Sequence, residues 1–193
     1  SCLVGSEMCI RDRNGDLWLG TMGNGGWKFN TESNHLSPLL TPSGEAYPHI
    51  LSITGNGEQV WLATFGGAYH CRSSQEQVEH FQEADGLGIS YTYQTIRDAK
   101  DRIWFATDGQ GAGIWQNDEL HLIPELIHQS IYSIKEDHIG QIWLSSEDSG
   151  LYRWSADTLT RFDIQTDLGA LQVLGIETYS DSSLLLVSSH GLG

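Results

Sequence analysis

Cysteine, proline and long apolar runs are all scarce in this sequence, and each shortage excludes a class of protein. Only 3 of the 193 residues are cysteine and only 4 are proline. Cys2 and Cys9 lie at the very N-terminus, so Cys71 is alone in the rest of the chain and no disulfide framework is indicated. No apolar run approaches the roughly 18 residues of a membrane-spanning helix. We therefore expect membrane attachment only through segments absent from this sequence.

Positive charge is also scarce. The chain has 10 Lys and Arg against 25 Asp and Glu, which gives a formal net charge of −15. Such an acidic surface repels phosphate backbones, so a nucleic-acid partner is not expected. The 8 histidines show no metal-ligand spacing, and we expect neither a metal nor a cofactor.

One segment of the sequence recurs along the chain. Residues 137–154 read DHIGQIWLSSEDSGLYRW, and related segments occur every 39 to 43 residues. The repeated position is marked by Trp18, Trp61, Trp104, Trp143 and, in the last unit, Leu185. A fixed period of this length indicates a propeller, a solenoid or an array of repeats.

The second unit shows four parts. His49–Thr54 and Gln59–Thr64 are rich in strand-forming residues, Ala68–Cys71 follows a Gly-Gly turn, and Val78 and Phe81 mark a fourth short segment. Four short antiparallel strands in about 40 residues are typical of a propeller blade. We therefore predict an all-β fold, a β-propeller fragment forming an open arc, with three complete and two partial blades. The predicted blades are 14–40, 48–82, 91–124, 130–165 and 171–193, with the marker tryptophans packed between neighbouring blades.

The first residues are set apart by their sequence. Leu3–Asp12 reads LVGSEMCIRD and resembles a sequencing adapter translated in one frame. We interpret residues 1–13 as an adapter-derived, non-native segment. The alternative is a natural strand followed by a polar tail.

The repeats resemble a known family. Asp137–Arg153 follows the pattern D-x-x-G-x-[IL]-W-[IVLF]-[GA]-T, then glycines, then G-L-x-[RK], and Arg102–Thr107 reads RIWFAT. With the DGL linker at Asp85–Leu87, this is similar to the two-component regulator propeller repeat. The sequence departs from the pattern at Ser145 and Ser146, where Gly and Thr are usual, at Gly55 in place of the leading Asp, and at Leu185 in place of Trp.

This resemblance implies a function. Propellers of the family form the periplasmic or extracytoplasmic sensor domain of hybrid two-component or diguanylate cyclase signalling proteins, and their ligands are often oligosaccharides. The expected partners are a small-molecule or oligosaccharide ligand, the remaining blades of the same chain and, in the full-length protein, a second copy in a homodimer. Two alternatives stay open, a propeller enzyme such as a glycosidase or lyase, and a passive protein-interaction scaffold.

Acidic residues in the turns are candidates for catalysis, but their positions favour a structural role. We expect Asp98 and Asp137 to accept hydrogen bonds from turn amides rather than to bind calcium or act in catalysis. The acid pairs Glu136–Asp137 and Glu147–Asp148 resemble those of glycosidases, yet both fall in predicted hairpin turns. We predict no catalytic residue in this segment.

A ligand site is expected where the inter-blade loops meet the first strand of the next blade. Aromatic and histidine residues gather at these positions, and they vary in type from blade to blade. The predicted ligand-binding residues are Tyr47, His49, Tyr91, Tyr93, His128 and Tyr132. The alternative is that half of them pack beneath the loops.

Overall fold

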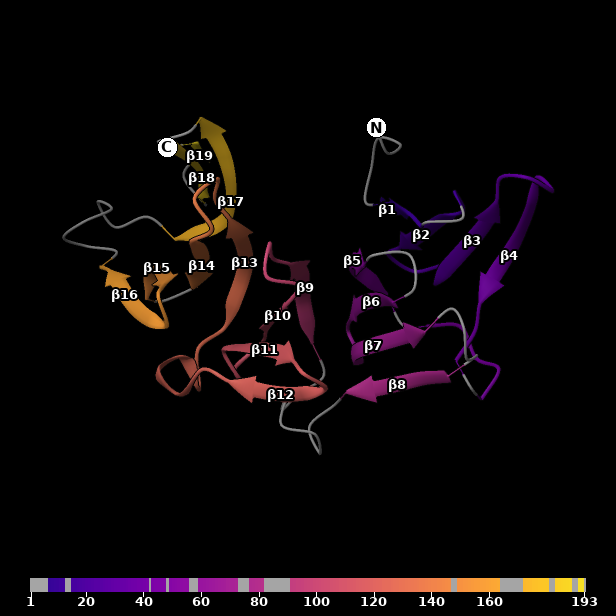
Figure 1. The fold of residues 1–193 in the computed structure, drawn as a ribbon, viewed down its shortest axis with the longest axis horizontal. Helices are drawn as coiled ribbons and strands as arrows, with labels where there is room; N and C mark the ends of the chain where they lie inside the picture. Colours follow the sequence, from indigo (N-terminus) through magenta and orange to yellow (C-terminus); the bar gives the residue numbers. More distant parts are fainter. Residues whose placement is uncertain are drawn as a thin grey trace. The chain divides into compact units, whose positions relative to one another are not determined.

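Short antiparallel strands make up nearly all of the secondary structure, as the turn-rich sequence predicts. The computed structural model describes residues 7–12, 15–41, 43–47, 49–55, 59–72, 77–81, 91–146, 149–163, 172–180, 183–188 and 191–192. Within these residues the single helical segment is the 3-10 turn η2, Pro124–Leu126. The all-β prediction is confirmed. The chain divides into two compact units, Ser1–Thr95 and Ile96–Gly193, and each has a hydrophobic core of its own. Figure 1 shows the strands of the chain with their labels.

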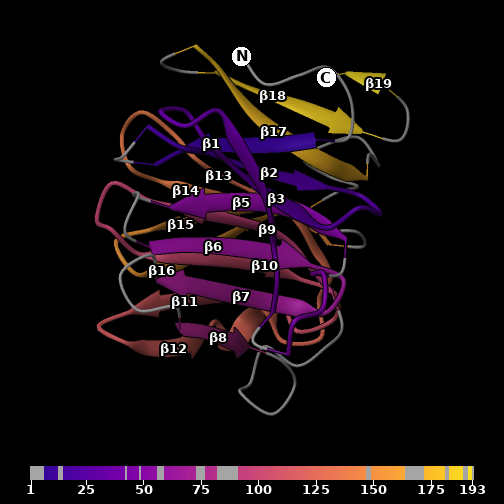
Figure 2. The ribbon, with the colours of Figure 1, turned by 90° about the vertical axis from the view of Figure 1, so that its right-hand side faces the viewer.

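Unit 1 contains two four-stranded antiparallel sheets with their strands in chain order. The first sheet consists of β1 (Glu7–Arg11), β2 (Leu17–Thr21), β3 (Gly26–Asn30) and β4 (His35–Leu39). The second consists of β5 (Ile50–Gly55), β6 (Gln59–Thr64), β7 (Gly67–Arg72) and β8 (Gln77–Phe81). Figure 2 shows the second sheet face-on, with β5 to β8 succeeding one another across it.

The remaining sheets repeat this plan. The third consists of β9 (Thr92–Arg97), in which the boundary between the units falls, β10 (Ile103–Thr107), β11 (Ala112–Gln116) and β12 (Glu119–Leu122). The fourth consists of β13 (Ile131–Glu136), β14 (Ile142–Ser146), β15 (Gly150–Ser155) and β16 (Thr158–Phe162). The fifth has three described strands, β17 (Val173–Ser180), β18 (Ser183–Ser188) and β19 (Gly191–Leu192). None of the five sheets closes on itself.

The first sheet is more complete than the sequence predicts. We expected a partial blade beginning near residue 14, but β1 pairs with β2 over five residues, from Glu7 opposite Thr21 to Arg11 opposite Leu17. Without β1, the strand β2 would expose a row of unpaired backbone groups, and an adjacent extended segment satisfies them. This pairing does not test the origin of residues 1–13, and the adapter interpretation remains a prediction.

The core lies between successive sheets. In unit 1, Trp18 of the first sheet packs with Ile50, Ile53 and Leu62 of the second. Gly20 makes this approach possible, because a Cβ atom there would lie 2.5 Å from Cγ2 of Ile50. Burying an isoleucine completely contributes about 1.5–3 kcal/mol. The glycine therefore allows the first strand of one blade to pack on the second strand of the preceding blade.

Unit 2 uses the same arrangement twice. Trp104 and Ala106 of the third sheet pack with Ile131 and Ile134 of the fourth. Trp143 of the fourth sheet packs against a cluster formed by Leu151 of its own sheet and Val173 and Ile176 of the fifth. The prediction that marker tryptophans pack between blades is confirmed at Trp18, Trp104 and Trp143.

Candidate ligand-binding site

The turn between the first and second strands of a blade is closed by an aspartate. In the fourth sheet, Oδ1 of Asp137 accepts from the backbone amides of Ile139 (3.1 Å) and Gln141 (2.8 Å). Its Oδ2 accepts from Nε1 of Trp143 at 2.8 Å. The carboxylate thereby joins the turn to the marker tryptophan.

An aspartate makes the same hydrogen bonds, to turn amides and to the marker tryptophan, in two other sheets. Asp98 accepts from the amides of Lys100 and Arg102 and from Nε1 of Trp104 at 2.8 Å. Asp12 accepts from the amide of Asp16 and from Nε1 of Trp18 at 3.0 Å. The prediction that Asp98 and Asp137 accept hydrogen bonds from turn amides is confirmed.

Two of these carboxylates also face a cation of their own blade. Nε of Arg102 lies 2.6 Å from Oδ2 of Asp98, and its guanidinium lies over the Trp104 ring. Burial raises the pKa of the Asp98 carboxyl, but the hydrogen bonds from Trp104 and Arg102 and the charge of Arg102 outweigh it, so the pKa falls below its ordinary value. In the first sheet, Nζ of Lys28 lies 3.6 Å from Oδ2 of Asp12 and over the Trp18 ring.

The second sheet has no aspartate at this turn, where Gly55 stands instead. There the ring of Trp61 stacks on His70, with centroids 3.9 Å apart and planes 5° from parallel. Nδ1 of His70 lies 3.2 Å from Oε2 of Glu79. A histidine thus takes the cross-strand position that Lys28 has opposite Trp18.

Both carboxylates of the acid pair Glu136–Asp137 accept hydrogen bonds from backbone amides. Both carboxylate oxygens of Glu136 accept from the backbone amide of Ala99, at 3.1 and 2.9 Å. Asp137 is engaged by its own turn. The pair Glu147–Asp148 lies outside the described residues.

Tyr47, the first of the predicted ligand residues, lies in the core. Its side chain is only 4% exposed, its ring meets Tyr69 edge-on at 4.7 Å, and its hydroxyl lies 3.8 Å from Sγ of Cys71. Burial raises the pKa of both the Tyr47 hydroxyl and the Cys71 thiol, the latter to about 11. The structure therefore leaves Tyr47 no surface to offer to a ligand.

His49 and Tyr91, two other predicted ligand residues, both have their rings next to Phe65, which the sequence analysis did not name as a candidate. The ring of Phe65 lies 5.2 Å from that of His49 and 5.0 Å from that of Tyr91. His49 and Tyr91 are exposed and Phe65 is half-buried. Phe65 begins the turn between β6 and β7, and its amide donates to the His49 carbonyl at 3.3 Å. We call His49, Phe65 and Tyr91 the aromatic row.

The remaining predicted residues lie on other elements. Tyr93 is half-buried in β9, and Tyr132 is half-buried in β13 of unit 2. His128 is exposed, with a backbone φ of +71°. Beside it, Oε1 of Gln129 accepts from the hydroxyls of Ser146 (3.2 Å) and Ser149 (2.6 Å). The sequence analysis did not predict this polar cluster, because Gln129, Ser146 and Ser149 lie on different strands and loops.

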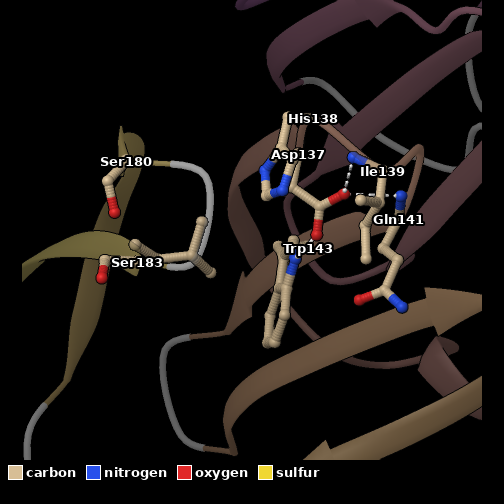
Figure 3. Close-up of a pocket in the computed structure, with 8 residues that line it drawn as sticks. Asp137, His138, Ile139, Gln141, Trp143, Ser180 and Ser183 are labelled. Carbon is tan, nitrogen blue, oxygen red and sulfur yellow. Dashed lines mark hydrogen bonds between the residues drawn. The ribbon is translucent and has the colours of Figure 1, made fainter.

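Unit 2 also contains a pocket of about 170 Å³ beside the Asp137 turn. Figure 3 shows His138 and Asp137 on one side of it and Ser180 and Ser183 on the other, with Trp143 below the aspartate. It is lined by Asp137, His138, Ile139, Gln141, Trp143, Ser180, Ser183 and Leu184. A shallower pocket of about 390 Å³ shares Asp137, His138 and Ser180 and adds Glu136, Thr178 and Tyr179.

Among the described side chains, no three His, Cys, Asp or Glu residues gather as they would around a metal ion. The described part of the chain also contains no helix with the length and apolar character that crossing a bilayer requires.

Successive four-stranded antiparallel sheets that pack through a repeated tryptophan define a β-propeller architecture. Residues 125–148, which include the Asp137 turn, match the model of the two component regulator propeller family. The resemblance drawn from the sequence is therefore confirmed at this repeat. None of the curated proteins matches this chain.

Solved structures share the fold. The chain is similar to the extracellular domains of two hybrid two component systems of B. thetaiotaomicron. The first is 18% identical with a TM-score of 0.75 over 96% of this chain and 25% of that one. The second is 16% identical with a TM-score of 0.70 over 95% and 26%. The chain thus spans about a quarter of these domains.

An enzyme shares the fold as well. Virginiamycin B lyase from Staphylococcus aureus is 16% identical with a TM-score of 0.67, over 98% of this chain and 69% of that one. At these identities the likeness shows the propeller fold alone, which serves both sensors and enzymes.

Proposed function

We propose that this chain is part of an extracytoplasmic sensor propeller in a two-component or cyclic-di-nucleotide signalling protein, and that it binds an oligosaccharide or another small polar ligand. The matched repeat and the likeness to extracellular domains of hybrid two component systems support this proposal. The ligand in question would be neutral or weakly charged, because the net charge of −15 disfavours polyanions.

The observation that carries the proposal is the aromatic row. It places the phenyl ring of Phe65 between an imidazole and a phenol, with centroid distances of 5.2 and 5.0 Å and ring planes tilted by 51° and 62°, and the two outer rings are exposed. Flat rings stack on the apolar faces of sugars, while the imidazole and the phenol hydroxyl provide hydrogen bonds. Such a group of rings suits the faces and hydroxyls of an oligosaccharide.

Binding can be tested on the full-length protein that contains this chain. A panel of linear oligosaccharides of six or seven sugars, such as maltoheptaose, cellohexaose and xylohexaose, would be titrated by calorimetry. We expect Phe65→Ala to weaken binding of the active oligosaccharide about tenfold, which corresponds to about 1.4 kcal/mol. Tyr179→Ala, at an exposed aromatic residue of unit 2, is the matched control and should change affinity less than twofold. Equal losses in both variants would contradict a role for the row.

We further propose that this segment is not itself an enzyme. The acids with a suggestive neighbour, Glu136 and Asp137, hold backbone amides and an indole rather than facing each other across a cleft. Incubation of the same oligosaccharides with the protein should leave their chain lengths unchanged on chromatography. Shortened products that disappear in Glu136→Gln would favour the enzyme alternative.

A further inference from the structure

The pocket beside Asp137, defined above by its eight lining residues, lies where one repeat differs from two others. In the first and third sheets, the Oδ2 atom of the turn aspartate faces a cation of the same blade. Lys28 lies 3.6 Å from Asp12, and Arg102 lies 2.6 Å from Asp98. Both carboxylates are buried. The cation offsets the cost of desolvating the carboxylate.

At Asp137 the described residues supply no lysine or arginine ion pair of this kind. The position two residues before the marker tryptophan, which is Arg102 in the third sheet, is the neutral Gln141 in the fourth. Arg153, which lies opposite Trp143 as Lys28 lies opposite Trp18, places its guanidinium over the Trp143 and Phe162 rings instead. In the described part of the chain, no ion pair joins a lysine or arginine to Asp137, and this aspartate is half-buried rather than buried.

A second difference opens the space above the turn. The third-sheet turn is covered by Glu136, whose carboxylate binds the amide of Ala99. The residue equivalent to Glu136 in the fifth sheet is Thr178, whose shorter side chain leaves the Asp137 turn uncovered. Thr178 lines the shallower pocket together with Tyr179. At the Asp137 turn, Gln141 and Thr178 thus stand where Arg102 and Glu136 stand at the Asp98 turn, and each lines one of the two pockets.

The lining chemistry of the two adjoining pockets selects for a small cation. Their described residues include the carboxylates of Glu136 and Asp137 and no lysine or arginine. Trp143 and Tyr179 add aromatic rings, which attract cations, and Ser180 and Ser183 add hydroxyls. A volume of about 170 Å³ is below that of pockets for drug-sized ligands, which start at about 300 Å³. The pocket therefore suits a molecule with a single ring or a short chain.

We propose that this pocket binds a small organic molecule through a primary ammonium group. The ammonium pairs with the carboxylate of Asp137, as the guanidinium of Arg102 pairs with the carboxylate of Asp98. The ring or chain of the ligand lies against Leu184 and the edge of Trp143, and its hydroxyls reach Ser180 and Ser183. This inference is independent of the oligosaccharide proposal, because it concerns another unit and a different ligand group.

The test uses two probes of equal size on the full chain. At pH 7, trans-4-aminocyclohexanol carries an ammonium group, whereas trans-1,4-cyclohexanediol is neutral. Nα-acetyl-lysine methylamide serves as a third probe, which asks whether the ammonium of a lysine side chain is accepted as well. In calorimetric or NMR titrations we expect at least one of the two amines to bind at least tenfold more tightly than the diol. Raising the ionic strength to 0.5 M should weaken this binding several-fold.

The decisive variant is Gln141→Arg, which supplies from the chain the guanidinium that Arg102 supplies in the third sheet. It should reduce amine binding at least tenfold while leaving the unfolding temperature unchanged or higher. Gln116→Arg, which adds the same charge at an exposed position of β11 outside both pockets, is the matched control and should keep affinity within threefold of the parent. Equal binding of amine and diol, absence of amine binding at millimolar concentration, or amine binding unaffected by Gln141→Arg would each overturn the proposal. An equal loss of binding in Gln116→Arg would overturn it too, because added positive charge anywhere on the chain would then be the cause.

Discussion

Nε1 of Trp143 donates to Oδ2 of Asp137 over 2.8 Å, and the same bond joins Trp104 to Asp98. In each case the aspartate lies six residues before the tryptophan. The indole packs between two sheets while the carboxylate holds the turn at the end of the same sheet. One pair of side chains therefore couples the turn within a blade to the packing between blades.

Replacing Trp104 should destabilise unit 2 strongly. The indole is fully buried in the cluster between the third and fourth sheets and bonds to Asp98. We expect Trp104→Ala to lower the free energy of unfolding by about 3–5 kcal/mol, measured by urea denaturation. Trp104→Phe keeps much of the packing and should lose less. Equal losses in the two variants would mean that the hydrogen bond, rather than the buried ring, dominates.

Because of the Asp98 carboxyl, the free energy of unfolding should fall as the pH is lowered into the acid range. Its folded-state pKa lies below the ordinary 3.8, so its contribution is present above about pH 4 and is lost as the pH falls through the folded pKa. Asp98→Asn leaves the buried Arg102 without its counter-charge, so we expect a loss of about 3–5 kcal/mol at pH 7. The difference in unfolding free energy between the parent and Asp98→Asn should become smaller below pH 3.8, as measured by chemical denaturation at a series of pH values.

Asp101 provides the matched control for this measurement. Its side chain is 73% exposed and pairs with Arg97 on the surface. Asp101→Asn should cost less than about 1 kcal/mol, because exposed ion pairs contribute little. A larger loss from Asp101→Asn than from Asp98→Asn would contradict the importance given to the buried carboxylate.

A methyl group at position 20 should disturb the packing between the first two sheets. A Cβ atom there would lie 2.5 Å from Cγ2 of Ile50 and 3.0 Å from Cδ1 of Ile53. We therefore expect Gly20→Ala to cost about 1–3 kcal/mol by overpacking. Gly175→Ala is the control, because its Cβ atom would meet Val187 at an ordinary 3.5 Å. Thermal unfolding of the two variants should show a lower melting temperature for Gly20→Ala alone.

The Cys71 thiol should be protected from reaction. Burial raises its pKa to about 11, so the reactive thiolate is rare at neutral pH. In a variant with Cys2 and Cys9 replaced by serine, we expect a disulfide reagent at pH 8 to label Cys71 only as fast as the protein opens. This thiol's contribution to stability is fully present below the unfolded pKa of about 9 and is lost as the pH rises towards 11. Immediate labelling of the folded protein would show that the thiol is accessible.

The outer residues of the aromatic row should contribute to binding and little to stability. Because His49 and Tyr91 are exposed, we expect His49→Ala and Tyr91→Ala each to change the free energy of unfolding by less than about 1 kcal/mol. Each should weaken binding of the oligosaccharide identified with the panel. Tyr47→Ala, at a buried ring, should instead cost about 3–5 kcal/mol. Losses of several kcal/mol in all three variants would place the row in the core and the ligand site elsewhere.

The sequence by itself determined the repeat and most of its local structure. A repeat of 39 to 43 residues in tryptophan, glycine and aspartate positions predicts strands and turns, since side-chain alternation and turn chemistry act over a few residues. For the same reason the hydrogen bonds from turn amides to Asp98 and Asp137 could be predicted. The packing of Trp104 between sheets followed from the need of each sheet to cover both faces.

The tertiary structure decided what depends on residues far apart in the chain. Tyr47 and His49 are two residues apart, yet one ring is buried against Tyr69 and the other meets Phe65. The Asp137 pocket brings Gln141 of the fourth sheet together with Ser183 of the fifth. Sequence periodicity aligns such positions but does not say which side chains meet across a turn or how far they reach. Those contacts are set by the distance between packed sheets and by side-chain length, which are properties of the folded molecule.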